Sequence, residues 1–250
     1  MADALSKTIE SFRLDGLQAV VTGASRGLGK GCALAMAGAG ADVVVIGRAQ
    51  EDLDAVAEDI RALGRTATVI AVDVTDIELF ADKLGELSRV DIFVNNAGTN
   101  RPQPFLSVDA ETYDALMDVN LRGAFFAAQS AARMMVETGH GGSIINMSSQ
   151  AGHRALRDRT VYSASKFGLE GLTKAMAFEL AEHSIRVNAV TPTFVETPLA
   201  KQFLQNKDFR DYVENKIRLP RLGQVEDVAA AVLYLASPAA AMVTGTSLLV

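Results

Sequence analysis

The sequence predicts an α/β fold in which helices cover both faces of one doubly wound, parallel, seven-stranded sheet with strand order 3-2-1-4-5-6-7. Short apolar, β-branched runs alternate along the chain with longer segments of helical periodicity, as in a parallel sheet buried on both faces. No Pro/Ser-rich linker, low-complexity tract or internal repeat divides the 250 residues, so we expect one domain over 1–250. Right-handed crossovers then favour the doubly wound order.

Seven runs are expected to form the strands, in chain order 19–21, 43–46, 68–72, 92–94, 143–145, 186–190 and 247–250. Helical spacing is clear at 51–63, where apolar residues recur every three or four positions. The ranges 110–137 and 160–182 are also helical in pattern and rich in alanine, so they could pack against the core alone or against a symmetry mate. The charged, aromatic-dotted range 196–222 interrupts the alternation, and we expect a helical lid over the site there.

Composition excludes several classes of protein. The net charge of −6 and the acidic pI of about 5.2 argue against a nucleic-acid or anionic-membrane surface. Cys32 is the single cysteine, so no internal disulfide is expected, which suits a reducing cytosol. The first thirteen residues lack the apolar core of a signal peptide, and the apolar stretch 228–236 is too short to span a bilayer. A soluble cytoplasmic protein is expected.

A glycine-rich turn follows the first expected strand, in the order Thr22-Gly23-Ala24-Ser25-Arg26-Gly27-Leu28-Gly29. Gly23 lets the chain turn sharply, Gly27 permits close approach of the backbone to a pyrophosphate, and Gly29 lets the following helix pack against the sheet. The N-terminus of that helix offers free N–H groups to phosphates. The alternative is an ordinary glycine-rich turn, but the strand before it and the helix after it favour a dinucleotide site.

The end of the second expected strand predicts the choice of cofactor. Enzymes that prefer NAD usually place an acidic residue there for the ribose 2′-hydroxyl. Here the position is Gly47, followed by Arg48, and Arg26 can approach the same ribose. Two guanidinium groups without a carboxylate favour the 2′-phosphate of NADP(H). NAD(H) stays the alternative if both arginines are solvated surface charges.

Tyr162 and Lys166 lie four residues apart at the start of an expected helix, so they share one face. A free phenol has a pKa near ~10, and a neighbouring ammonium would lower that pKa and fit the phenol for proton transfer. Ser149 ends an expected strand, where open α/β sheets bind ligands. Asn120 lies within a helical pattern, where it could instead belong to a structural hydrogen-bond network.

These residues, together with Asp73-Val74 and Asn95-Asn96-Ala97-Gly98, resemble the short-chain dehydrogenase/reductase family in its branch of roughly 250 residues, over nearly the whole chain. The resemblance implies a Rossmann fold, a homotetramer joined through 110–137 and 160–182, and no metal; the three histidines lack ligand spacing. By this resemblance, Asp73 and Val74 would hold the adenine, Asn96 would lie near the adenosine ribose, and Val195 and Thr197 would contact the nicotinamide carboxamide and the phosphates. Lys166 would bind the nicotinamide ribose. Ser149 would orient the substrate carbonyl, Asn120 would hold a water of the proton relay, and Tyr162 would transfer the proton.

Substrate identity is less sharply marked. The expected pocket residues are Arg101, Ser149, Gln150, Arg154 and Phe194. Arginines at such a rim could attract a carboxylate or polyol, as in family members that act on sugar acids such as gluconate, or could be solvated loop charges. We therefore expect hydride transfer between NADP(H) and a small polar carbonyl or secondary alcohol. A 3-oxoacyl thioester reductase is the alternative enzyme, and a nucleotide-binding sensor without turnover is the alternative of another class.

Overall fold

The computed structural model of the chain describes residues 7–198, 200 and 204–250. All seven strands are parallel and lie in the order β3-β2-β1-β4-β5-β6-β7, which confirms the predicted sheet. The strands are β1 (Gln18–Thr22), β2 (Asp42–Gly47), β3 (Ala67–Ala71), β4 (Ile92–Asn95), β5 (Gly142–Met147), β6 (Ile185–Thr191) and β7 (Ser247–Leu249). Each lies within a residue or two of its expected range.

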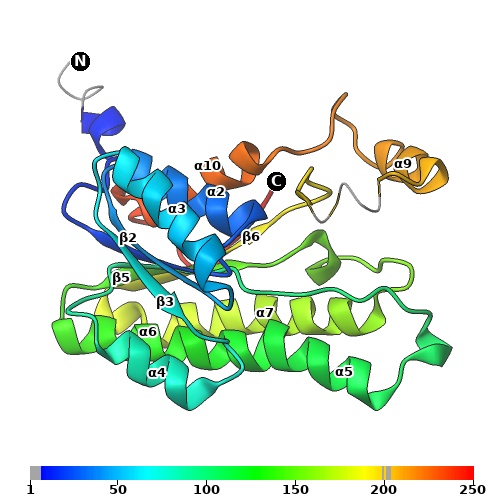
Figure 1. Cartoon of the computed structure of the whole chain (residues 1–250), viewed down its shortest axis with the longest axis horizontal. Helices are drawn as coiled ribbons and strands as arrows, with labels where there is room; N and C mark the ends of the chain where they lie inside the picture. Colours follow the sequence, from blue (N-terminus) through cyan, green and yellow to red (C-terminus); the bar gives the residue numbers. More distant parts are fainter. Residues whose placement is uncertain (1–6, 199, 201–203) are drawn as a thin grey trace.

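Helices cover both faces of the sheet. The longer ones are α2 (Gly27–Gly38), α3 (Gln50–Ala62), α4 (Ile77–Gly85), α5 (Ala110–Met117), α6 (Ala124–Thr138), α7 (Thr160–Glu179), α9 (Lys207–Glu214) and α10 (Val225–Ala236). Figure 1 shows α2, α3 and α10 on one face and α4, α5, α6 and α7 on the other. None of the described helices is both long enough and apolar enough to cross a membrane.

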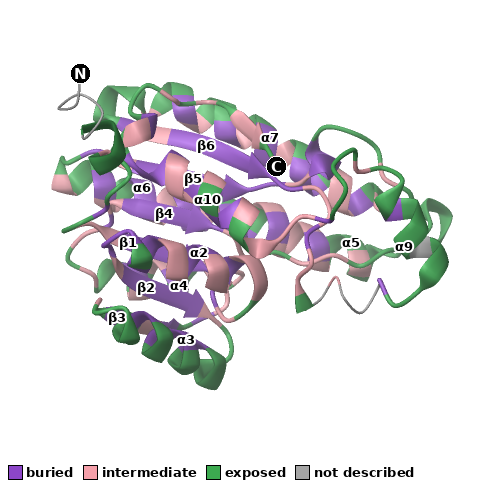
Figure 2. Ribbon diagram, turned by 90° about the horizontal axis from the view of Figure 1, so that it is seen from above, coloured by how far each residue is buried: buried purple, intermediate pink, exposed green. Residues whose placement is uncertain are grey.

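The sheet separates two apolar layers, which explains why its strands are apolar on both sides. Side chains of β1 alternate between them, with Val21 in the layer under α2 and Val20 in the layer under α4 and α6. Phe80 of α4 and Phe93 of β4 are among the largest fully buried side chains. In Figure 2 the central strands are buried along most of their length. Burial of this surface is the main stabilising contribution to the fold.

Two paired asparagines join β4 to β5 at the carboxyl edge of the sheet. Asn95 of β4 pairs with Asn146 of β5, and the Asn95 Nδ2 donates to Asn146 Oδ1 over 3.0 Å and to the carbonyl of Ala124 over 2.8 Å. Asn146 Nδ2 then donates to Thr173 Oγ1 of α7 over 3.0 Å. These buried bonds tie two strands to α6 and α7, so the loops that follow the strands hold a defined position.

The expected helix at 110–137 is interrupted. Between α5 and α6 the chain forms a π-helical segment, η2 (Asp118–Gly123), in which each turn holds more residues than in an α-helix. Five of the six alanines expected at a core or a subunit contact are buried in the core of this chain, and these are Ala127, Ala128, Ala131 and Ala132 of α6 and Ala177 of α7. The sixth, Ala175 of α7, is exposed. The outer face of these helices instead exposes larger side chains, such as Phe125, Phe167 and Phe178.

The two residues that flank the range 196–222, which is expected to form a helical lid, lie side by side. Val195 and Gly223 form an isolated bridge, with the Glu196 N–H donating to the Gly223 carbonyl over 2.9 Å. Within it lies the short helix α9, beyond the carboxyl ends of the strands (Figure 2). Leu204, Val213 and Leu222 form a small apolar cluster of their own. Residues 199 and 201–203 of the expected lid lie outside the described residues.

Candidate active site

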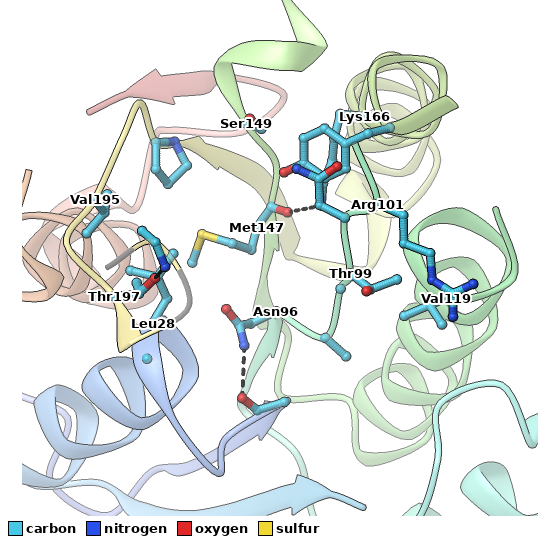
Figure 3. A pocket seen from close by; sticks show the side chains of 18 of the residues that line it. Leu28, Asn96, Thr99, Arg101, Val119, Met147, Ser149, Lys166, Val195 and Thr197 are labelled. Atoms are coloured by element: carbon cyan, nitrogen blue, oxygen red, sulfur yellow. Dashed lines mark hydrogen bonds between the residues drawn. The ribbon is translucent and has the colours of Figure 1, made fainter. Parts of the chain in front are cut away.

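A cavity of about 1280 Å³ lies at the carboxyl edge of the sheet, where the loops after β1, β2, β4, β5 and β6 meet. Eighteen of the predicted site residues line it, and these are Gly23, Ser25, Arg26, Gly27, Leu28, Gly29, Arg48, Asp73, Val74, Asn96, Arg101, Ser149, Gln150, Tyr162, Lys166, Phe194, Val195 and Thr197. Figure 3 shows Leu28, Val195 and Thr197 on one side of the cavity and Thr99 and Val119 on the other. The fold thus brings both predicted groups, nucleotide-binding and catalytic, to one cavity.

The glycine turn has the geometry that a pyrophosphate cradle needs. Gly23 and Gly27 have φ of +63° and +56°, in the left-handed region that favours glycine. A Cβ on Gly29 would lie 2.1 Å from the Gly23 carbonyl oxygen, so only glycine fits where α2 meets the turn. Helix α2 begins at Gly27, and among the described side chains none caps its first N–H groups. These N–H groups fit the phosphates of a dinucleotide.

Asn96 holds this turn from the neighbouring strand. Its Nδ2 donates to the carbonyl of Thr22 over 2.8 Å and to that of Gly23 over 3.2 Å (Figure 3), while its backbone N–H donates to Thr22 Oγ1 over 2.9 Å. Asn96 therefore lies in the cavity, as expected for a residue near the adenosine ribose, and its side chain also fixes the shape of the phosphate turn. Thr22, which the sequence did not single out, is its partner.

The adenosine end of the cavity carries one carboxylate and two guanidinium groups. Asp73 follows β3 and accepts hydrogen bonds from the Thr75 N–H and Oγ1, over 3.0 and 2.9 Å. Arg48 follows β2, and its Nη1 lies 3.8 Å from Asp73 Oδ2 with the side chain 78% exposed. Arg26 is exposed at the N-cap of α2. The end of β2 is Gly47, so the acidic residue typical of NAD sites is absent from that described position.

Tyr162, Ser149 and Lys166 converge at the opposite end of the cavity. Tyr162 and Lys166 both lie on α7, and the Ser149 hydroxyl lies close enough to the Tyr162 phenol to lower its pKa. Lys166 is buried, its Nζ donates to the Met147 carbonyl over 2.8 Å, and this Nζ lies 5.7 Å from the centroid of the Tyr162 ring. The Met147 contact uses a backbone carbonyl at the end of β5, so no side-chain signal in the sequence could have revealed it.

The electrostatics of this group differ from the expectation. Burial raises the pKa of the Tyr162 phenol, whereas the hydrogen bond with Ser149 and the charge of Arg159 oppose that rise. Ser149 and Arg159 are the groups that lower the pKa of the phenol in this structure, and the acidifying role expected of Lys166 stays a prediction. Burial also lowers the pKa of Lys166 to about 8, against the opposing charge of Glu170. Lys166 therefore changes its charge close to neutral pH.

Asn120 lies beside the cavity rather than in its lining. Its Oδ1 accepts from the Thr99 N–H over 2.7 Å, and its Nδ2 donates to the Thr99 carbonyl over 2.8 Å and to Ser165 Oγ over 3.3 Å. It belongs to the π-helical segment η2, not to a regular helix as the pattern indicated. The structural-network alternative is therefore realised, and Asn120 ties the loop after β4 to α7.

The expected substrate residues separate into two groups. Ser149, Gln150 and Phe194 lie at the catalytic end, whereas Arg101 is exposed and extends toward Val119 in Figure 3. Arg154 is exposed and absent from the described lining, because the loop before α7 turns Arg157 and Arg159 toward the cavity in its place. Among the described residues, no cluster of three or more His, Cys, Asp or Glu side chains could hold a metal.

Comparison with known proteins agrees with this geometry. A family model described as "Enoyl-(Acyl carrier protein) reductase" matches residues 23–250. The L-xylulose reductase of Bos taurus is 40% identical over 236 residues, which are 94% of this chain and 95% of that protein. The D-erythrulose reductase of Gallus gallus is 38% identical over 240 residues, 96% and 95% of the two chains.

Solved structures are equally similar. A gluconate 5-dehydrogenase from Burkholderia cenocepacia J2315, in complex with NADP and tartrate, superposes with a TM-score of 0.93 at 34% identity, over 97% of this chain and 96% of that chain. A short-chain type dehydrogenase/reductase from Mycobacterium marinum superposes with a TM-score of 0.92 at 40% identity, over 97% of each chain. The likeness spans nearly the full length of both partners, and the chain belongs to the short-chain dehydrogenase/reductase family of NAD(P)-dependent oxidoreductases.

Proposed function

We propose that the protein transfers a hydride between NADP(H) and a small polyhydroxylated ketone or sugar acid, with Tyr162 as the proton donor or acceptor. The observation that carries the proposal is that Tyr162 and Ser149 line the same cavity as a glycine turn shaped for phosphates, with the buried Lys166 one helical turn from Tyr162. The cofactor would lie between these two ends, held by the glycine turn, Asn96 and Lys166. When bound, it supplies the hydride that reaches the carbonyl carbon.

In the reducing direction, the residues of the chain handle the proton and the orientation of the substrate. The Ser149 hydroxyl would hydrogen-bond the substrate carbonyl, and Tyr162 would donate its phenolic proton to the same oxygen as that oxygen becomes an alkoxide. An ammonium on Lys166 stabilises the resulting phenolate. We further propose that Asn120, through Thr99 and Ser165, holds the wall behind Lys166 against which a relay water would lie.

One buried polar group in the pocket favours a hydroxylated substrate over an acyl chain. Gln150 is 7% exposed, and its Oε1 has no hydrogen-bond partner among the described residues. Rotation of this amide would let it meet a substrate hydroxyl, and a buried amide left without a partner opposes binding of an analogue that lacks the hydroxyl. The xylulose, erythrulose and gluconate enzymes among its relatives support the same substrate class. The family model's description names an acyl carrier substrate, which keeps a thioester as the alternative, although an enoyl group is reduced at a carbon–carbon double bond and not at a carbonyl.

The deciding experiment measures NADPH oxidation with L-xylulose, D-erythrulose, keto-gluconate and an acetoacetyl thioester. Turnover of the sugars or the keto acid supports the proposal, whereas turnover of the thioester alone would establish the alternative. Tyr162→Phe should bind NADPH as the wild type does and lose activity by about 10²- to 10⁴-fold, the usual contribution of a general acid. Tyr113→Phe, an exposed tyrosine on α5, is the matched control. Equal turnover in Tyr162→Phe would refute the mechanism, and tight NADPH binding without any turnover would favour a sensor.

The preference for NADP(H) rests on Arg48 and Arg26 at the adenosine end. Arg48 already pairs with Asp73, so its guanidinium is directed toward the part of the cavity expected to hold the ribose. Arg48→Asp should shift the ratio of kcat/KM for NADPH and NADH toward NADH by at least tenfold, because a carboxylate repels the 2′-phosphate. Arg133→Asp, on the exposed side of α6, should leave the ratio unchanged. An unaltered ratio in Arg48→Asp would refute this assignment.

We also propose a cytoplasmic homotetramer joined through the outer face of α6 and α7, and a lid at 196–222. Phe125, Phe167 and Phe178 are exposed on those helices, and apolar side chains of that size favour a covered interface. Light scattering on the purified protein distinguishes a tetramer from a monomer.

The proposed lid is tested by limited proteolysis. Cleavage within 196–222 should be slower when NADPH and substrate are both present.

A further inference from the structure

Glu170 is a carboxylate buried behind the catalytic helix, and donors from separate elements surround it. The residue is 5% exposed. Thr191 Oγ1, at the end of β6, donates to its Oε1 over 3.2 Å, and Ser247 Oγ, in β7, donates to its Oε2. His153, which follows the short helix η3 (Gln150–Gly152), places its Nε2 3.2 Å from Oε1. One side chain thus connects α7 to β6, β7 and the segment after Ser149.

The Glu170 carboxylate needs these partners, because burying a carboxylate costs free energy unless hydrogen bonds replace those it made to water. The short helix η3 also packs closely against Glu170. A Cβ on Gly152 would lie 3.0 Å from Glu170 Cγ and 3.1 Å from the Lys166 carbonyl, so η3 lies directly against this part of α7. Glu170 is therefore held in one position, and that position is next to the catalytic group.

Lys166 lies one helical turn before Glu170 on α7, so both side chains project from the same face. Lys166 is buried, which lowers its pKa, and the charge of Glu170 opposes that effect. The other titratable groups near the pair are Tyr162, whose ring centroid is 5.7 Å from the ammonium, and His153 on the far side of Glu170. From the start of α7, Arg159 acts on Tyr162. From η2 the nearest group is the uncharged Asn120.

We propose that Glu170 is a positioning residue that keeps Lys166 in its ammonium form and locks the catalytic face of α7 against β6, β7 and η3. The inference rests on the proposed roles of Tyr162 and Lys166. Without the carboxylate, a larger share of the protein near neutral pH carries an uncharged Lys166, which cannot stabilise the phenolate of Tyr162 after proton transfer.

The test follows the protonation of Lys166 directly, by NMR of protein that carries ¹³C at the lysine ε-carbons, without substrate or cofactor. The Lys166 signal is identified by its loss in Lys166→Met. In Glu170→Gln the midpoint of its titration should fall by about one pH unit or more relative to the wild type, the shift that loss of one nearby opposite charge produces. Glu179→Gln, on the exposed end of the same helix, is the matched control and should leave the midpoint in place.

A second, isosteric pair separates charge from packing. Glu170→Asp should keep the midpoint within about half a pH unit of the wild type, and Glu170→Asn should lower it as Glu170→Gln does. The alkaline limb of the pH profile of kcat/KM should move with the midpoint. Equal Lys166 midpoints in the charged and uncharged variants would overturn the proposal. Because the titration involves no turnover, this failure is distinct from a failure of the Tyr162→Phe test.

Discussion

Replacing Lys166 by methionine should make the folded protein more stable at neutral pH while it abolishes turnover. Methionine has a similar length and no charge. Burial lowers the pKa of Lys166 from 10.5 to about 8, so at neutral pH the folded state must keep an ammonium in a site that disfavours it. The substitution removes that cost, together with the hydrogen bond to the Met147 carbonyl, whose loss opposes the gain.

The size and sign of the effect follow from linkage. A lowered pKa means that the unfolded chain binds more protons than the folded one between pH of about 8 and 10.5, so the free energy of unfolding of the wild type rises with pH across that window. The cost of the ammonium is roughly 3 kcal/mol near pH 7 and falls to about 1 kcal/mol near pH 9.5. The stability difference between Lys166→Met and the wild type should therefore shrink by about 2 kcal/mol over that range.

Urea unfolding of both proteins, at several pH values and constant ionic strength, measures this difference. Groups that titrate in both proteins cancel, and the hydrogen bond to Met147 contributes a nearly constant offset, so the slope with pH reports Lys166. Lys174→Met, an exposed lysine on the same helix, should show no such slope. A stability difference that stays constant from neutral to alkaline pH would refute the reasoning, since it would mean that Lys166 keeps an ordinary pKa in the folded state.

Two further predictions concern other parts of the fold. Gly29→Ala should weaken NADPH binding at least tenfold and lower the Tm, because the new Cβ would lie 2.1 Å from the Gly23 carbonyl oxygen. Gly38→Ala on the same helix, whose new Cβ would meet no atom of the described residues within 4 Å, should leave the affinity measured by fluorescence titration unchanged, and equal affinities for Gly29→Ala and the wild type would contradict the phosphate-binding role of the turn. Burial raises the pKa of the Cys32 thiol to about 12, so a thiol-specific colorimetric reagent should react with it only after unfolding in urea, and rapid labelling of the native protein would contradict its burial.

Local patterns in the sequence were enough to predict the sheet and to name most of the residues that line the cavity. Apolar runs separated by helical segments leave a chain of this size few arrangements besides a doubly wound sheet, since parallel strands need long right-handed crossovers. The turn at Gly23 and Gly29 follows from the demands of a tight strand-to-helix connection. Tyr162 and Lys166 share a face because helical periodicity fixes that over one turn. The carboxyl edges of parallel strands then bring these parts together.

Other features depend on contacts between residues far apart in the chain. Asn120 lies in a π-helical segment whose amide is bonded to Thr99, and Arg154 points away while Arg159 reaches the cavity. Side-chain direction in an irregular segment depends on what packs against it, which no local pattern records.

The pKa values of the site residues also depend on contacts between residues far apart in the chain. A tyrosine followed by a lysine one turn later predicts an acidified phenol, yet burial raises the pKa of Tyr162 and lowers that of Lys166. Glu170, which opposes the second effect, is held by Thr191 and Ser247 from two other strands. Spacing along strands and helices is a local property, so the order of the residues was enough to predict which chemical groups meet at the edge of the sheet. Their charge states depend on burial and on the field of distant residues, and both arise from the complete packing of the chain.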